Sequence, residues 1–147
     1  MSAHDHRKKL KPHYDVTAGI IWRGEKILIA QRRHGDPLDG LWEFPGGRRE
    51  QRETLKECLR REILEELGVT IRVNRHFMTV SHDYPQARIT LHFFNCSLQE
   101  GQPQALDCHT WRWVRPLELP NFSFLPADRK AVEALKRIQN EKTRLES

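Results

Sequence analysis

The sequence predicts an α+β fold in which a mixed β-sheet is sandwiched between α-helices. Two observations indicate it: short apolar segments bounded by turn residues are typical of strands, and two longer segments have the pattern of helices. The strands and helices are interspersed along the chain, which shows no internal repeat. A sheet with helices on its faces satisfies that order, and 147 residues suffice to bury the core of one domain.

The expected strands are joined by recognisable turns. Arg23-Gly24-Glu25 is a plausible hairpin turn between the first two strands, and Asp83-Tyr84-Pro85-Gln86 separates a later pair. A short strand stops at Pro45-Gly46-Gly47, where glycine lets the backbone turn tightly and approach a ligand. In chain order, the strands are expected at residues 15–22, 26–32, 41–44, 69–82, 87–98 and 110–114.

Two helices complete the predicted domain. Residues 54–67 form the first, and Gly68 suits its C-terminal end because glycine readily adopts the left-handed conformation found there. The second helix covers residues 126–140 and has Pro126 near its start, where proline is well tolerated.

Composition indicates one domain, residues 15–140, between a mobile basic tail at 1–14 and a short tail at 141–147. The net charge of +5 favours anionic partners, but part of it lies in the first tail. No apolar run approaches the length of a membrane span. Three cysteines without CxxC spacing favour the reducing cytoplasm, and the absence of a His-x-x-x-His pair argues against zinc.

The helix at 54–67 places carboxylates in its own apolar stripe. On a helical wheel, Glu62 and Glu66 lie within about 20° of the origin of the stripe at Leu55, and Glu65 lies at its edge. Three explanations compete: a solvated helix with arginine partners, a structural ion pair, or a divalent cation held by several carboxylates. Because these glutamates converge on one patch where like charges would repel, their spacing favours the cation.

A longer motif around this helix resembles a known family. Gly47, five residues, Glu53, seven residues and then Arg61-Glu62-Ile63-Leu64-Glu65-Glu66-Leu67-Gly68-Val69 match the Nudix box at every defined position. The resemblance implies the Nudix fold. It also implies hydrolysis of a nucleoside diphosphate linked to another group, with Mg²⁺ as the cofactor and Mn²⁺ as a possible substitute.

Roles for individual residues follow from the resemblance. Glu62 or a neighbour would activate water, and Arg61 and Glu53 would form a supporting ion pair. The catalytic set implied by position is Glu53, Arg61, Glu62 and Glu66. The metal ligands implied by position are the Gly46 carbonyl group, Glu62, Glu65 and Glu66.

Two positions depart from the family pattern. Relatives commonly carry Pro-Gly before the first glutamate of the box, where this chain has Gln51-Arg52, so we expect an altered loop with its chemistry intact. A further metal-binding or general-base glutamate, six residues before Trp113, is replaced by Asp107. Aspartate is one methylene shorter, and we therefore expect Asp107 to reach the metal through water.

The segments DGLWEFPGG, ITLHFF, WRWV and FLPAD resemble the MutT branch of the family. Arg33 is then either a phosphate- or sugar-binding residue or an ordinary surface charge. Asp128 either accepts from the donor edge of a base, as an ionised carboxylate can, or simply favours the start of a helix. Phe124 and Leu125 form an apolar wall or belong to the core. The substrate-binding residues implied by the resemblance are Arg33, Glu43, Phe44, Pro45, Gly46 and Asp128.

This branch implies hydrolysis of nucleoside triphosphates, oxidised ones such as 8-oxo-dGTP above all, to a monophosphate and pyrophosphate. The alternatives are another Nudix substrate, such as the 5′ end of RNA, ADP-ribose or a dinucleoside polyphosphate, or a non-catalytic module that recognises lesions, like the C-terminal domain of the glycosylase MutY. A complete carboxylate set favours an enzyme. We expect a small-molecule substrate, no stable nucleic-acid complex, no membrane partner, and a monomer or homodimer.

Overall fold

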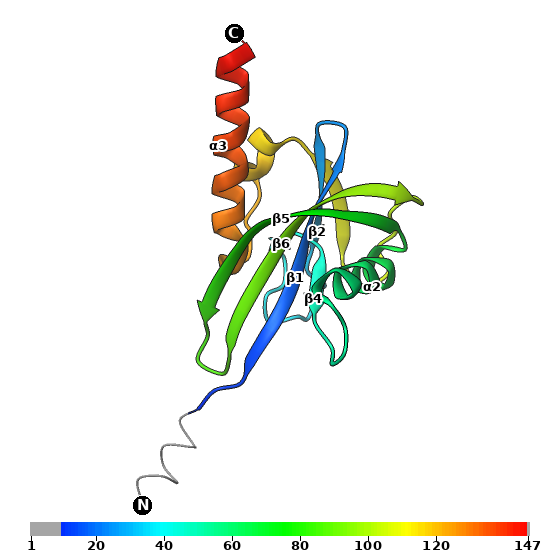
Figure 1. The fold of residues 1–147 in the computed structure, drawn as a ribbon, viewed down its shortest axis with the longest axis vertical. Coiled ribbons are helices and arrows are strands. Elements are labelled where there is room, and N and C mark those ends of the chain that lie inside the picture. Colours follow the sequence, from blue (N-terminus) through cyan, green and yellow to red (C-terminus); the bar gives the residue numbers. More distant parts are fainter. Residues whose placement is uncertain (1–9, 147) are drawn as a thin grey trace, which may run out of the picture.

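A computed structural model describes residues 10–146 as a mixed sheet with a helix on each face (Figure 1), which confirms the predicted α+β fold class. The strands are β1 (His13–Arg23), β2 (Lys26–Gln31), β3 (Trp42–Glu43), β4 (Gly46–Arg48), β5 (Thr70–Asp83), β6 (Arg88–Glu100) and β7 (Thr110–Val114). The helices are α2 (Leu55–Leu67) and α3 (Arg129–Glu146), and the 3-10 helices are η1 (Pro116–Asn121) and η2 (Pro126–Asp128).

Strand β1 lies at the centre of the sheet, whose order is β3-β2-β1-β6-β5. It pairs in parallel with β6, while its other edge carries two antiparallel partners. The end of β1 near Trp22 pairs with β2, and the stretch Val16–Ala18 pairs with β4. Between these pairings, Gly19 N–H donates to the carbonyl oxygen of Pro45 at 2.8 Å. The turn from β3 to β4 is therefore held against the middle of β1.

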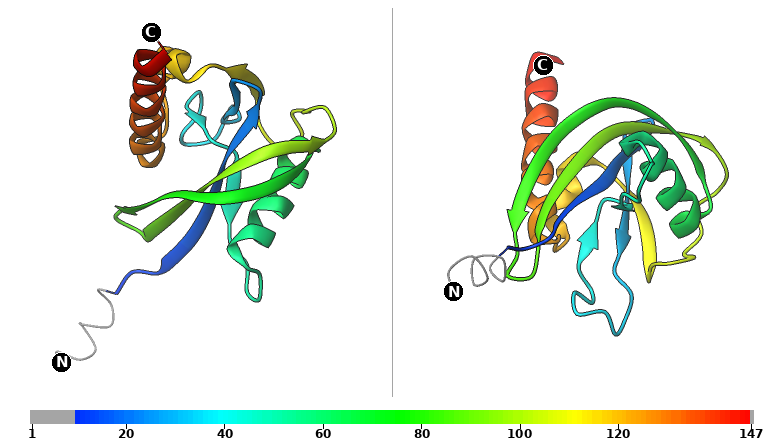
Figure 2. Two further views of the ribbon diagram at one scale, coloured as in Figure 1. Left: turned by 45° about the horizontal axis from the view of Figure 1, so that its top comes forward. Right: turned by 60° about the horizontal axis from the view of Figure 1, so that its bottom comes forward.

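Neighbouring residues of the central strands face opposite sides of the sheet, as the period of two requires. Ile20 and Phe93 belong to the core beneath α3, whereas Ile21 and Phe94 belong to the core beneath α2. The two helices lie on opposite faces of the sheet (Figure 2). Burial of both faces explains why these strands are apolar in consecutive positions rather than in alternate ones.

The first strand and the last helix are longer than predicted. Strand β1 begins at His13 rather than at residue 15, because His13 and Tyr14 pair with β6 and the Arg48 guanidinium stacks over the Tyr14 ring. Residues 1–9 of the predicted tail lie outside the described residues. Helix α3 continues to Glu146, past the predicted end at residue 140, since no glycine or proline interrupts it. Among the described residues, no helix is both long and apolar enough to span a membrane.

Candidate active site

Helix α2 is capped at both ends, and this fixes the direction of its side chains. The Thr54 hydroxyl oxygen accepts from Glu57 N–H at 3.1 Å, and the Glu57 carboxylate accepts from Thr54 N–H at 2.8 Å. This capping box pairs N–H groups that the start of a helix leaves without partners. Gly68 ends the helix with a φ of 69°, a left-handed conformation that glycine adopts without strain.

The glutamates of α2 differ in exposure. Glu66 is buried, with 8% of its surface exposed, and the Glu62 side chain is 23% exposed. Their positions agree with the apolar stripe of the helical wheel. The Glu65 side chain is 61% exposed, and it accepts a hydrogen bond from Arg61 at 3.3 Å. The structure thus brings Glu62 and Glu66 to one cleft and leaves Glu65 on the outer side of the helix.

Arg61 connects these carboxylates to the loop before the helix. Its guanidinium donates to the two carboxylate oxygens of Glu53 at 2.6 and 2.8 Å, and to Glu62 at 2.9 Å. The ion pair expected between Arg61 and Glu53 is present. The hydrogen bond from Arg61 lowers the pKa of Glu53 to about 2, and the same bond raises the pKa of Arg61. Glu62 is consequently held in one orientation by a charge-assisted bond.

The loop between β4 and α2 contains the altered sequence Gln51-Arg52. Arg52 has a φ of 70°, and within residues 10–146 it is the single non-glycine residue with a positive φ. The loop therefore makes a left-handed turn at Arg52, the position where the family resemblance implies glycine. Arginine in the left-handed region carries a steric cost of about 1 kcal/mol.

The glycines of β4 allow close approach to β1 and α2. A Cβ atom at Gly46 would lie 1.9 Å from the carbonyl oxygen of Thr17, so this position cannot hold a side chain unless the backbone moves. A Cβ atom at Gly47 would lie 2.2 Å from Cδ of Glu62 and would displace that carboxylate. A backbone hydrogen bond from Gly46 reaches Glu66. The glycine turn and the carboxylates of α2 therefore form one unit.

Glu66 is a buried carboxylate with an unusual electrostatic environment. Its Oε1 atom is buried without a hydrogen-bond partner. Burial, followed by the negative charges of Glu43, Asp107 and Glu62, raises the pKa of Glu66 to about 9. A buried, unpartnered carboxylate among other carboxylates is stabilised by a hard cation, which accepts oxygen ligands. The residues present therefore fit a divalent metal ion.

The carboxylates that surround Glu66 face one cleft of about 380 Å³, which we call the charged cleft. Asp107 is brought there by its backbone, because Asp107 N–H donates to the carbonyl oxygen of Glu66 at 3.1 Å. Within the described residues, no three His, Cys, Asp or Glu side chains are already gathered as a ligand cluster. The residues that line the charged cleft include Arg32, Arg33, Glu43, Glu62, Glu66 and Asp107.

A second cleft of about 320 Å³ adjoins the first and shares Arg32, Glu43 and Gly46 with it. We call it the apolar cleft, because aliphatic and aromatic side chains of β1, β6, the β5–β6 turn and the segments that follow β3 and η1 make up most of its walls. The two clefts adjoin at these three residues, and we call the pair the groove. The residues that line the apolar cleft include Leu38, Phe44, Tyr84, Leu91, Leu125 and Asp128.

Asp128 is the buried acidic group of the apolar cleft. It is 3% exposed, and its carboxylate accepts from Phe44 N–H at 3.3 Å. Burial and the neighbouring charge of Glu43 raise the pKa of Asp128 well above its usual value. From the sequence, Asp128 was expected to be an ionised carboxylate. Its burial favours the neutral acid instead. Leu125 lines the cleft, while Phe124 is buried in the core beneath α3.

The arginine at the junction of the clefts is Arg32, not Arg33. Arg32 lines both clefts and bonds Asp36 at 2.8 Å and Glu43 at 3.4 Å. The Arg33 side chain is 65% exposed and pairs with Asp107 at 2.7 Å. The alternation of side chains at the end of β2 separates the two arginines, and sequence reasoning selected the outer one.

Other residues were missed or placed differently. His34, Asp36 and Tyr84 line the groove and were not among the predicted site residues. His34 and Asp36 come from a loop, and Tyr84 from a turn, so neither segment has a periodic pattern that could have revealed them. Pro45 is not among the residues that line either cleft, and its carbonyl oxygen accepts from Gly19 N–H of β1, so its contact with the substrate stays a prediction.

The NUDIX domain family matches residues 17–134. The chain belongs to the Nudix hydrolases. This match covers all the residues that line the charged cleft, all but Val16 of those that line the apolar cleft, helix α2 and the start of α3. The family predicted from the box is therefore confirmed.

Known proteins place this Nudix hydrolase in the MutT branch. An 8-oxo-dGTP diphosphatase of Buchnera aphidicola is 33% identical over 113 residues, which cover 77% of this chain and 89% of the relative. A CTP pyrophosphohydrolase of Escherichia coli is 35% identical over 120 residues, which cover 82% and 89%. The solved structure of the E. coli ORF135 protein has a TM-score of 0.77 and 32% identity, covering 88% of this chain and 92% of its own. The chain is thus a MutT-type hydrolase of nucleotide diphosphate bonds.

Proposed function

We propose that the protein hydrolyses nucleoside triphosphates, oxidised ones such as 8-oxo-dGTP in particular, to a monophosphate and pyrophosphate in a Mg²⁺-dependent reaction. The observation that carries this proposal is the pair of adjoining clefts that make up the groove. One arm exposes carboxylates around the unpartnered Oε1 atom of Glu66, and the other is an apolar cleft of suitable size for a base, with Asp128 buried in its wall. The name of the Buchnera relative supports the oxidised guanine nucleotide.

Glu66 and Glu62 would hold the metal, together with the carbonyl group of Gly46, and Asp107 would contact it through water. When bound, Mg²⁺ neutralises the charge that develops on the leaving pyrophosphate. Glu65 belongs to this set only as an outer ligand, because its side chain is largely exposed and bonded to Arg61. Mn²⁺ would substitute because it accepts the same oxygen ligands.

Glu62 is the residue that we assign to the attacking water. Its carboxylate is oriented by Arg61, which Glu53 in turn holds through two hydrogen bonds. A carboxylate fixed in this way accepts the proton of the water as the water attacks phosphorus. Arg61 and Glu53 act through Glu62 and do not need to touch the substrate.

Arg32, Glu43 and Gly46 occupy the junction where the sugar and the first phosphate would lie. We therefore assign phosphate binding to Arg32 and a lesser role to Arg33 at the rim. In the apolar cleft, Phe44 would contact the base and Asp128 would select it. A neutral Asp128 offers one donor and one acceptor, which suits the O6 and N1–H groups of guanine.

A cytosine nucleotide is the second candidate substrate. The E. coli relative named CTP pyrophosphohydrolase is as similar to this chain as the Buchnera protein is. Cytosine also presents a donor beside an acceptor, its amino group and N3, so a neutral Asp128 can pair with either base. The two substrates are then distinguished by how well each base brings its donor and acceptor to Asp128.

A substrate screen tests the proposal. Purified protein is incubated with oxidised, methylated and unmodified nucleoside triphosphates, including CTP, and both pyrophosphate and monophosphate are quantified. We expect pyrophosphate release that requires Mg²⁺ or Mn²⁺ and stops with EDTA, with the highest kcat/KM for an oxidised guanine nucleotide. Hydrolysis of ADP-ribose, a dinucleoside polyphosphate or capped RNA without any triphosphate activity would contradict it.

The proposal extends to the oligomeric state of the protein and to its cellular compartment. One chain supplies the carboxylates, Arg32 and Asp128, and we infer that the protein acts as a monomer or a homodimer. Three buried free thiols suit a reducing cytoplasm: Cys58, Cys96 and Cys108.

A further inference from the structure

The segment before β1 is bound to the turn between β5 and β6. Across this turn, Tyr84 N–H donates to the Ala87 carbonyl oxygen at 2.9 Å, and Ala87 N–H donates back to Tyr84 at 3.3 Å. Arg88 N–H donates to the carbonyl oxygen of Pro12 at 2.9 Å. The chain that leads into β1 therefore lies alongside the turn.

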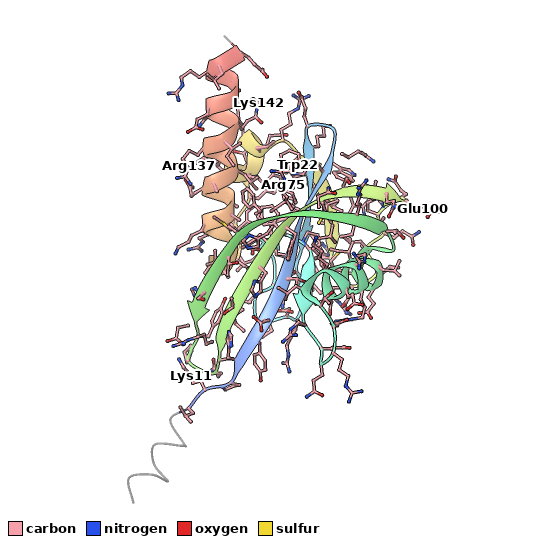
Figure 3. The ribbon with its side chains drawn as sticks, viewed as in Figure 1. Lys11, Trp22, Arg75, Glu100, Arg137 and Lys142 are labelled. Atoms are coloured by element: carbon pink, nitrogen blue, oxygen red, sulfur yellow. The ribbon has the colours of Figure 1, made fainter. Side chains whose placement is uncertain are left out.

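Lys11 adds two side-chain contacts to the same turn. Its ammonium group donates to the carbonyl oxygen of Tyr84 at 3.0 Å and forms an ion pair with Asp83. The hydrogen bond from Lys11 lowers the pKa of Asp83. Figure 3 shows Lys11 at the end of the molecule where β5 and β6 meet. A carbonyl oxygen and a carboxylate thus share one cation, which fixes the backbone at Tyr84.

Tyr84 extends from this turn into the apolar cleft. It lines the cleft together with Leu125 and Asp128, and its ring lies against His82 with 4.4 Å between ring centroids. Burial and the negative charge of Asp128 raise the pKa of Tyr84. The residue therefore offers an aromatic face and a hydroxyl donor in the cleft where Asp128 offers its carboxyl group.

We propose that Lys11 is a positioning residue for base recognition, because it holds the β5–β6 turn so that Tyr84 contacts the nucleobase in the apolar cleft. This inference rests on the proposed function, since a base must occupy that cleft. Lys11 lies before the family match at 17–134 and is not among the residues that line either cleft. Its influence on the substrate therefore passes through the turn.

The variant Lys11→Met tests the proposal through steady-state kinetics on the preferred triphosphate and on one with a different base. We expect KM for the preferred nucleotide to rise about three- to fivefold while kcat is retained, because an exposed pair contributes modestly and lies far from the metal ligands. The preference for that base should fall, and Lys11→Arg should restore it. Tyr84→Ala should raise the same KM about tenfold or more, as expected for loss of a stacking residue.

Lys26→Met is the matched control, because Lys26 is an exposed lysine at the β1–β2 hairpin. It should leave KM and base preference unchanged. If Lys11→Met lowers Tm but has the KM values of Lys26→Met, Lys11 only stabilises the fold and the proposal is overturned.

Calorimetric titration with nucleoside monophosphates separates this inference from the proposed function. A wild-type protein that hydrolyses no triphosphate contradicts the proposed function, yet its binding of monophosphates still reports on the cleft. Weaker binding to Lys11→Met than to Lys26→Met supports the inference. Equal Kd values for the two variants, or no binding by the wild type, overturn it.

Discussion

The charged cleft and the apolar cleft meet at Arg32, Glu43 and Gly46, yet they are assembled differently. The charged cleft takes Glu62 and Glu66 from one capped helix, next to a glycine turn that permits no side chain. The apolar cleft draws its walls from β1, β3, β6, η2 and the β5–β6 turn. Chemistry therefore depends on one continuous motif, while recognition depends on segments that tertiary structure brings together.

This difference explains how similar proteins can act on different bases. The two relatives named for 8-oxo-dGTP and for CTP are both similar to this chain over most of their length. A retained carboxylate helix allows the same hydrolysis, whereas changes around Tyr84 and Asp128 alter only the fit of the base. Variants in the two clefts should accordingly affect different kinetic constants.

Loss of a carboxylate from α2 should have the greatest effect. We expect Glu62→Gln and Glu66→Gln each to lower kcat by about a hundredfold or more, as for loss of a positioned base or ligand, with the ratios among nucleotides unchanged. Assays at saturating substrate and Mg²⁺ measure this. Near-normal turnover in both variants would remove the α2 carboxylates from the proposed mechanism.

Without metal, Glu66→Gln should raise Tm at pH 8. The folded-state pKa of Glu66 is about 9, above the ordinary value of 4.5. Between pH 4.5 and 9 the unfolded state releases the Glu66 proton while the folded state keeps it. The free energy of unfolding therefore falls as the pH rises through this range, and glutamine avoids that loss. Added Mg²⁺ should raise the Tm of the wild type but not that of the variant. Equal metal-induced shifts in both proteins would contradict the assigned ligand.

Asp128 provides the next test, within the apolar cleft. Loss of a buried hydrogen-bonding partner costs about 1 to 3 kcal/mol, so Asp128→Ala should raise KM for the preferred nucleotide about tenfold and flatten the preference among bases. Asp128→Asn should be milder. If Asp128 serves only the start of α3, the alanine variant will have a lower Tm and an unchanged base preference.

Variants of Arg32 and Arg33 test which arginine binds phosphate at the junction of the two clefts. Because Arg32 lines both clefts, Arg32→Ala should raise KM by roughly tenfold for every nucleotide alike, the effect of losing one charged hydrogen bond. Arg33→Ala should change KM less than about threefold, since its exposed pair with Asp107 is screened by solvent. A larger defect in Arg33→Ala than in Arg32→Ala would restore the assignment made from sequence.

The ion pair between Asp15 and His92 supports the β1–β6 pair beneath the apolar cleft, with 2.9 Å between Oδ1 and Nε2. The hydrogen bond from His92 lowers the pKa of Asp15 below 3.8. Its contribution to stability is therefore present above pH 3.8 and is lost as the pH falls through the folded-state value. Urea unfolding should show Asp15→Asn less stable than the wild type at pH 6, with a difference that shrinks as the pH falls below 3.8. A difference that does not shrink with falling pH would have another cause.

Sequence patterns could predict the charged cleft because its signals are local. The helical period placed Glu62 and Glu66 in the apolar stripe, and the box supplied Gly46, Glu53 and Arg61. Glu65 lies at the edge of that stripe, and whether an edge residue faces the cleft or the solvent depends on how α2 packs against the sheet. The choice between Arg32 and Arg33 depends on the exact register of β2, where an error of one residue reverses the direction of a side chain.

Most of the apolar cleft could not be predicted in the same way. Tyr84 reaches Asp128 only because β1 and β6 pair in parallel and carry the β5–β6 turn towards η2. The raised pKa of Asp128 likewise comes from burial by distant elements rather than from neighbours in sequence. The family resemblance indicated Asp128, but the burial that raises its pKa has no signal in the neighbouring sequence.

The separation of chemistry from recognition is tested most directly by one ratio, kcat/KM for 8-oxo-dGTP divided by kcat/KM for CTP. We expect Glu62→Gln to reduce both terms by about a hundredfold or more and leave the ratio at the wild-type value. Asp128→Ala should retain kcat and move the ratio towards one. A ratio altered by Glu62→Gln, or left intact by Asp128→Ala, would contradict the division of the groove into a chemical arm and a recognition arm.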